Sequence, residues 1–135
     1  MLRFFQYFWS LGLAVSAAFA QDDPVARGKY LVEDVIRCQE CHTPKLADRE
    51  FDRSRWLKGA VLEVQPIEPI KGWHKTSPDL TPGSRLWIKW GEPAILKYLQ
   101  TGIAPSGKPA DPPMPAYKLT TKDAEAVVAY LKTLK

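Results

Sequence analysis

Hydrophobic residues near the start of the chain recur at the spacing of one face of an α-helix. Gly28, Leu31, Val32 and Val35 stand at positions i, i+3, i+4 and i+7, which is the pattern of an amphipathic helix. The Asp-Pro pair at residues 23–24 suits the N-cap and first position of that helix, which we expect to run on to the first cysteine. A glycine inside a helix costs about 1 kcal/mol relative to alanine. Its place at the centre of the apolar face indicates that another helix crosses there at close range.

Two further helices are predicted in the second half of the chain. The first spans residues 92–101, with a proline in its first turn and Gly102 as its C-terminal stop. The second spans residues 121–134, where Thr120 and Asp123 resemble a capping box with Asp in place of Glu. Residues at helical spacing form their expected buried faces: Ile95, Tyr98 and Leu99, then Val127, Tyr130, Leu131 and Leu134. The three helices predict an all-α fold.

The segment between His42 and Trp90 has no such pattern. Prolines and glycines recur through it, and only Ala60 to Val64 resembles a short strand. A loop of this length is uncommon in a small domain. It is expected, however, if the loop wraps a large, flat, apolar cofactor that serves as the core.

Residues 1–20 have the pattern of a signal peptide. They carry one base and no acid, contain an apolar run and end in Ala-Phe-Ala at residues 18–20, after which polarity resumes at Gln21. An uncleaved membrane anchor is the alternative, but it normally needs about 20 apolar residues, and this run is shorter. We therefore expect cleavage after Ala20, a periplasmic location and one domain over residues 21–135.

The composition gives no sign of nucleic-acid binding. The formal net charge is +4, from 19 basic and 15 acidic residues, and the charges alternate in sign where a nucleic-acid-binding protein would have a clustered basic face. The chain has two cysteines, and a pair in an exported protein is usually a disulfide. A disulfide between residues this close in sequence would close a short loop and add little stability. Another role is therefore expected for the pair.

The two cysteines belong to the run Cys38-Gln39-Glu40-Cys41-His42. Cys-x-x-Cys-His is the signature of haem c attachment. On one helical turn both thiols can reach the two vinyl groups on the same side of a porphyrin, and the next residue places an imidazole beneath the iron. The motif occurs once, so we expect one covalent haem c, bonded to Cys38 and Cys41 and ligated by His42.

Three other interpretations of the motif remain open. A thioredoxin-like redox pair would lie near a βαβ pattern, which is missing around Cys38. A zinc site could use Cys38, Cys41, His42 and His74. Structural zinc prefers two spaced ligand pairs, however, and adjacent Cys41 and His42 would rarely both reach one tetrahedral ion. A plain disulfide is the third.

A second axial ligand is expected, because haem iron that only carries electrons usually has two protein ligands, commonly His and Met. After residue 20 the chain has one methionine, Met114, and one histidine besides His42, which is His74. Met114 lies among prolines that fix the backbone, so this stiff segment could hold a thioether against the iron. It could instead fill a gap in the core, and His74 remains the other candidate. We favour Met114.

The tryptophans are candidates to cover the edges of the haem. An indole N–H could also bond a haem propionate, because a buried indole usually finds a hydrogen-bond partner. Ordinary core packing is the alternative, and the sequence does not choose among the four: Trp56, Trp73, Trp87 and Trp90.

The order of these parts resembles the class I cytochrome c family, over essentially all of residues 22–135. The closest likeness is to small bacterial mono-haem cytochromes and to cytochrome subunits that accept electrons from periplasmic dehydrogenases. The resemblance is carried by Arg27-Gly28-Lys29-Tyr30-Leu31, the haem motif with Thr43-Pro44, Ser77-Pro78-Asp79-Leu80-Thr81-Pro82, Pro113-Met114-Pro115 and Leu119-Thr120-Thr121-Lys122-Asp123. It departs from the family at Asp79 and Gly83, which replace the usual polar residues there, and in a slightly longer spacing from Gly28 to Cys38.

The resemblance implies a class I cytochrome c fold, with three or more helices and long loops wrapped around one covalently bound haem. It implies thioether bonds at Cys38 and Cys41, axial ligands at His42 and Met114, and a helix crossing near Gly28. Its implied function is that of a one-electron carrier, not an enzyme. Its implied partners are redox proteins such as a dehydrogenase, an oxidase or another cytochrome, with no small-molecule substrate and membrane contact only through partners.

Two alternatives to a free carrier are kept. A haem enzyme or a gas sensor would need an open or displaceable sixth position on the iron, which a His/Met pair does not leave. An obligate subunit of a dehydrogenase would transfer electrons in the same way without diffusing freely.

Overall fold

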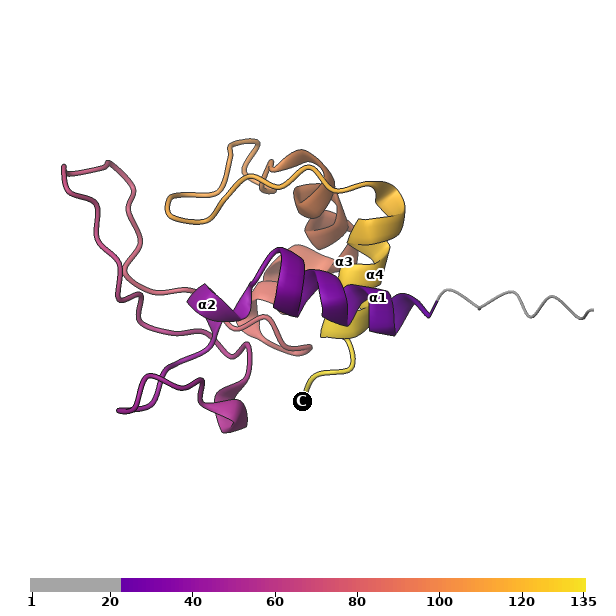
Figure 1. The fold of residues 1–135 in the computed structure, drawn as a ribbon. Coiled ribbons are helices and arrows are strands. Elements are labelled where there is room, and N and C mark those ends of the chain that lie inside the picture. Colours follow the sequence, from indigo (N-terminus) through magenta and orange to yellow (C-terminus); the bar gives the residue numbers. More distant parts are fainter. Residues whose placement is uncertain (1–22) are drawn as a thin grey trace, which may run out of the picture.

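The computed structural model describes residues 23–135, and this part of the chain is helical, with isolated bridges but no strand (Figure 1). The elements are α1 (Pro24–Tyr30), the π-helix η1 (Leu31–Val35), α2 (Gln39–His42), the 3₁₀-helix η2 (Arg53–Arg55), α3 (Arg85–Thr101) and α4 (Thr121–Leu131). The predicted all-α fold is confirmed. The predicted signal peptide, residues 1–20, lies outside the described residues. Among the helices that are described, none is long and apolar enough to cross a membrane.

Helix α1 begins as its sequence predicts. The Asp23 carboxylate accepts a hydrogen bond from the backbone N–H of Val25 at 2.9 Å, and Pro24 occupies the first helical position. Aspartate at an N-cap satisfies a backbone donor that has no partner inside the helix. This cap therefore sets where α1 begins. The Arg27 guanidinium of α1 also forms an ion pair with Asp123 of α4 at 2.9 Å, which fixes one helix against the other.

Helices α1 and α4 cross at Gly28 (Figure 1). A Cβ atom added to Gly28 would lie 1.8 Å from the carbonyl oxygen of Ala126 and 2.8 Å from the Cβ of Tyr130. Real Cβ atoms do not approach a carbonyl oxygen this closely, so only glycine fits between the two backbones. The predicted close crossing is confirmed.

After α1 the chain widens into the π-helix η1. The N–H of Ile36 bonds the carbonyl of Leu31 at 2.7 Å, and the N–H of Cys38 bonds that of Val32 at 2.9 Å. The wider turn accommodates the slightly long spacing between Gly28 and the cysteine motif. It also rotates the helix face, so Val35 is 53% exposed although its spacing predicted burial. The prediction for that one residue is wrong because it assumed regular α-helical geometry.

Helix α3 consists of two segments joined at Gly91, whose φ of 72° is not helical. The second segment runs from residue 92 to 101 and stops at the left-handed Gly102, as predicted. The first segment, residues 85–90, was not predicted. Its N-cap is Ser84, and four of its six residues are apolar, too short a run to show a clear helical pattern.

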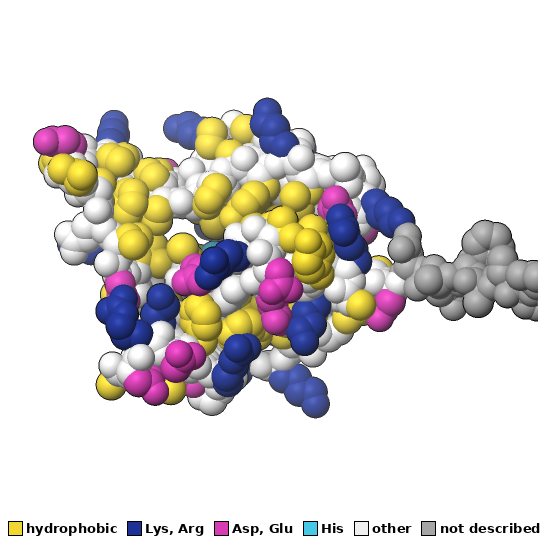
Figure 2. Space-filling view, viewed as in Figure 1, with side chains coloured by type: hydrophobic (Ala, Val, Ile, Leu, Met, Phe, Trp, Pro, Cys, Tyr) yellow, Lys and Arg dark blue, Asp and Glu magenta, His cyan; other side chains and the backbone are white. Residues whose placement is uncertain are grey.

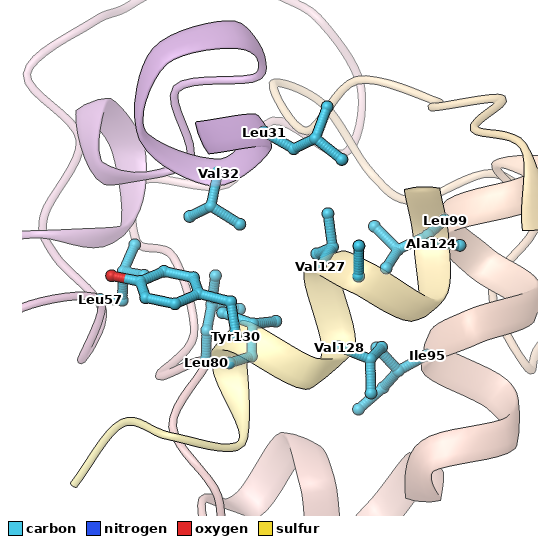
Figure 3. Packing of buried hydrophobic residues seen from close by; sticks show 12 residues of the cluster. Leu31, Val32, Leu57, Leu80, Ile95, Leu99, Ala124, Val127, Val128 and Tyr130 are labelled. Atoms are coloured by element: carbon cyan, nitrogen blue, oxygen red, sulfur yellow. The ribbon is translucent and has the colours of Figure 1, made fainter. Parts of the chain in front are cut away.

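Helix α4 starts at the predicted cap, where the Thr120 hydroxyl accepts from the N–H of Asp123 at 3.2 Å. It ends at residue 131, three residues before the predicted end. Figure 3 shows its apolar side facing both the N-terminal helix and α3. The buried cluster comprises Leu31, Val32, Leu57, Leu80, Ile95, Leu99, Ala124, Ala126, Val127, Val128, Tyr130 and Leu131.

The long connection between α2 and α3 is irregular but anchored. Leu57 is fully buried and Leu80 is 9% exposed, so two loop residues contribute to the core. The strand predicted at 60–64 is absent from this connection. Of residues 60–64 only Val61 forms a bridge, to Thr76, which makes residues 60–76 a loose hairpin.

Candidate haem-attachment site

Cys38 is the N-cap of the short helix α2, and Cys41 lies within the same turn. The backbone N–H groups of Cys41 and His42 bond the carbonyl of Cys38 at 3.2 and 2.9 Å. Both thiols are free, and burial raises the pKa of Cys38 to about 12 and raises that of Cys41. The two thiols therefore share one helical turn, as predicted, and burial keeps them neutral.

A side chain inside the motif fastens this turn to the helix before it. Gln39 is 6% exposed, and its Nε2 donates to the carbonyl of Glu33 in η1 at 2.7 Å. The Glu33 carboxylate in turn accepts from the Tyr130 hydroxyl of α4. Arg37, between the two elements, has a positive φ of 59°. The orientation of the cysteines is thus tied to the crossing of α1 and α4.

His42 is oriented for ligation. It is 4% exposed, and its Nδ1 lies 2.8 Å from the backbone carbonyl of Pro78. Because a carbonyl can only accept, Nδ1 carries the proton, and Nε2 is left with a free lone pair. Burial lowers the pKa of His42 more than the Pro78 bond raises it. The imidazole is therefore neutral at pH 7, which is the form that binds metals. Histidine ligands usually donate the N–H of their other nitrogen to a carbonyl or carboxylate, as Nδ1 of His42 does here.

The segment that carries Pro78 is itself held in place. The N–H of Leu80 bonds the carbonyl of Leu57 at 2.8 Å, and the Asp79 carboxylate accepts from the N–H and hydroxyl of Thr81, both at 2.7 Å. Asp79, a departure from the family pattern, thus closes a local turn. Pro78 belongs to a segment that resembles the family pattern, but the sequence alone does not indicate that its carbonyl orients His42.

The loop that carries Met114 is anchored from α3. The Tyr98 hydroxyl donates to the carbonyl of Pro115 at 2.9 Å, and the N–H of Leu119 bonds the carbonyl of Leu99 at 2.9 Å. Met114 itself is partly buried. The predicted burial of Tyr98 is confirmed. The bond from its hydroxyl to Pro115 was not predicted, because the two residues are distant in sequence.

The Met114 loop and the cysteine turn face one another. Burial raises the pKa of Tyr117 above its ordinary range, and the nearby Cys38 and Cys41 raise it further. Figure 2 shows a hollow on this face with hydrophobic side chains gathered around it. In the same view of Figure 1, α2, the 60–76 hairpin and the loop before α4 surround that place. An apolar hollow beside two thiols and a neutral imidazole suits a haem.

One tryptophan is distinguished from the others by an unsatisfied donor. The Trp73 Nε1 is buried with no hydrogen-bond partner. Trp56 donates to the Tyr130 hydroxyl at 3.3 Å, Trp87 donates to the carbonyl of Leu80 at 2.8 Å, and the Trp90 ring contacts Tyr98 edge-on. A buried N–H without a protein acceptor is rare, and a haem propionate is an acceptor that would satisfy it. The residues present therefore fit the group.

His74 does not join the cysteines. Its Nε2 lies 3.2 Å from the Asp111 carboxylate, and its side chain is 60% exposed. Within residues 23–135 no three His, Cys, Asp or Glu side chains lie close enough together to hold one metal ion. The four ligands considered for zinc are thus not assembled.

Comparisons with known proteins identify relatives of this chain. The family model of cytochrome c matches residues 25–135. The chain is 35% identical to a "Diheme cytochrome c-type" of Cereibacter sphaeroides over 78% of its length, and 32% identical to a "Gluconate 2-dehydrogenase cytochrome c subunit" of Pantoea cypripedii over 85%. It is 29% identical to a "Fructose dehydrogenase cytochrome subunit" of Gluconobacter japonicus over 84%. The matches cover only 34%, 27% and 22% of those proteins, so each relative is much longer than this chain.

Proposed function

This chain belongs to the cytochrome c family, and on that premise we propose that it is a one-electron carrier with a single haem c. Cys38 and Cys41 would form the thioether bonds, and His42 and Met114 would be the axial ligands. The observation that carries the proposal is His42, buried and neutral, with Nδ1 donating to Pro78 directly after the cysteine pair. Bound haem would supply the one-electron couple of its iron.

The chain's own residues would bind, orient and shield that group. The Pro78 carbonyl keeps Nε2 of His42 available, and Tyr98 holds the carbonyl next to Met114. In the proposed holoprotein both cysteines are bonded to the haem and the free nitrogen of His42 is taken up by the iron, so none of the three would act as a nucleophile or general base. These features support electron transfer without substrate chemistry.

The predicted signal peptide and the relatives support a proposal for location and partners. We propose that residues 1–20 are removed and that the domain over residues 21–135 works in the periplasm. The printed names of two relatives describe cytochrome subunits of a fructose dehydrogenase and a gluconate dehydrogenase. We therefore propose a redox protein as partner, either a dehydrogenase that holds this chain as a subunit or an oxidase or cytochrome that it meets in solution.

Removal of Met114 tests the carrier against a haem enzyme or gas sensor. The parent protein, exported with haem, should show the weak long-wavelength methionine-to-iron band when oxidised and should not bind carbon monoxide when reduced. Met114→Ala should lose the band and bind carbon monoxide, because the sixth position is then open. Visible spectra of both proteins, with and without carbon monoxide, provide the measurement.

An exposed residue of the same loop supplies the control. Lys118→Ala should behave like the parent in both spectra, because Lys118 is exposed. If the parent already binds carbon monoxide and Met114→Ala looks the same, the sixth position is open in the native protein. The carrier proposal would then give way to the enzyme or sensor alternative.

The unpartnered indole of Trp73 gives a separate prediction. Trp73→Phe keeps a ring but removes the N–H, so a propionate that it bonds would lose a donor. Hydrogen bonds to a carboxylate favour its charged form, so the propionate pKa should rise. The pH-dependent step of the reduction potential should move to higher pH, and the free energy of unfolding should fall by about 1.5 kcal/mol.

Trp87→Phe is the matched control for that experiment. Its indole N–H already donates to the carbonyl of Leu80, so its loss should lower stability without moving the pH-dependent step. Equal pH profiles for the parent, Trp73→Phe and Trp87→Phe, measured by redox titration across pH, would rule out Trp73 as the propionate donor.

A further inference from the structure

The 60–76 hairpin is fastened to the Met114 loop through His74. The backbone N–H of His74 donates to the carbonyl of Pro112 at 2.8 Å. Its imidazole Nε2 lies 3.2 Å from Oδ2 of Asp111. Two consecutive residues of the methionine loop are therefore held by one residue of a distant loop.

Asp111 connects this contact directly to the methionine. Its backbone carbonyl accepts the N–H of Met114 at 3.3 Å, which closes the turn on which Met114 sits. Gly72 of the hairpin also lies close to Asp111, because an added Cβ there would be 3.2 Å from the Asp111 carboxylate. Asp111 is thus held by the hairpin through its side chain and holds Met114 through its backbone.

We propose that His74 and Asp111 form a latch that positions the axial methionine. This inference rests on the proposed function, in which Met114 is the sixth ligand of a haem iron. Neither residue would touch the iron; both would restrict the loop that carries Met114, so that the thioether stays near its binding position when the bond opens. Because a carboxylate oxygen accepts, Nε2–H of His74 is the donor in this contact.

The geometry favours a latch over an incidental surface contact. Both side chains are exposed, 60% for His74 and 65% for Asp111, so the contact alone contributes little to folding. Its position matters more, because it joins the hairpin that carries Trp73 to the turn that carries Met114. Loss of the contact would therefore weaken binding of Met114 to the iron more than it would lower the free energy of unfolding.

Competition by imidazole measures the latch. Free imidazole binds the oxidised protein only when Met114 leaves the iron, so its affinity reports how firmly the loop is held. His74→Ala and Asp111→Ala should each raise imidazole affinity about two- to fivefold, the range of a surface pair. The double variant should show no more than the larger single effect, since both changes break one contact. Asp111→Asn keeps an acceptor for His74 and should stay near the parent value.

A second exposed surface contact supplies the control. Lys132, the C-cap of α4, pairs with Glu92 in α3 at 2.8 Å, with side chains 52% and 42% exposed. Lys132→Ala should leave imidazole affinity unchanged, because this pair does not touch the Met114 loop.

The outcomes separate the latch from the proposed function. If the parent shows the methionine band but the His74 and Asp111 variants bind imidazole with the parent's affinity, the latch is wrong and the proposed function stands. Additive effects of the two single changes overturn it as well, because independent contributions mean that the residues do not act through each other. A parent without the methionine band, indistinguishable from Met114→Ala, overturns the axial assignment and the latch together.

Discussion

Replacing Gly28 by alanine is expected to lower the free energy of unfolding by about 3 kcal/mol or more. The new methyl group would lie 1.8 Å from the carbonyl oxygen of Ala126 and 2.5 Å from its carbonyl carbon. Both are backbone atoms in the middle of α4, so a side-chain rotation cannot relieve the clash. Intrinsic helix propensity favours alanine over glycine by about 1 kcal/mol, so the sign of the result shows which effect dominates.

Denaturant unfolding of the haem-loaded protein measures this change. Gly107→Ala is a suitable control, because Gly107 has a positive φ of 78° but no neighbouring atom within 4 Å of an added Cβ. It should show only the cost of a left-handed alanine, about 1 kcal/mol. A Gly28→Ala protein as stable as its parent would mean that α1 and α4 do not cross in contact.

Replacing both Cys38 and Cys41 by alanine should abolish retention of haem after denaturation. His42 and the apolar hollow would remain in this variant, but an axial bond and packing do not survive unfolding and extraction with acidified acetone. Each single variant, Cys38→Ala or Cys41→Ala, should keep haem on the chain through the remaining thioether bond. Absorbance of the extracted protein, compared with the parent, gives the retained fraction.

The single variants also serve as the control for folding, since each removes one small side chain. If the double variant holds haem through extraction as firmly as the parent, the covalent bonds lie elsewhere on the chain. The assignment of this motif would then be wrong.

The parts of the fold that follow local rules could be predicted from sequence. The cap at Asp23, the left-handed stop at Gly102 and the cap at Thr120 each depend on neighbours within a few residues. The crossing at Gly28 was predictable for a related reason, because a glycine in the middle of an apolar helix face is unfavourable unless something must approach it. In the site, the spacing of Cys38 to His42 was sufficient to predict which side chains share a turn.

The parts that failed depend on contacts distant in sequence or on irregular backbone. Val35 is exposed because η1 is a π-helix, which hydrophobic spacing cannot reveal. The first segment of α3, which Ser84 caps, has no clear amphipathic pattern. Residues 60–64 have strand-like composition but no partner strand. The bonds from Tyr98 to Pro115 and from His74 to Asp111 join loops that the sequence does not place side by side. For the same reason the sequence could not choose Trp73 among the four tryptophans.

The central claim is that one haem is covalently bound to Cys38 and Cys41 in the mature chain. The most direct test is the intact mass and visible spectrum of the parent protein, exported from a host with haem c maturation machinery and extracted with acidified acetone. The account predicts a chain that begins at Gln21, carries the mass of one haem and keeps its colour after extraction. A colourless protein at the bare mass of the chain, or one that releases all its haem into the acetone, would contradict it.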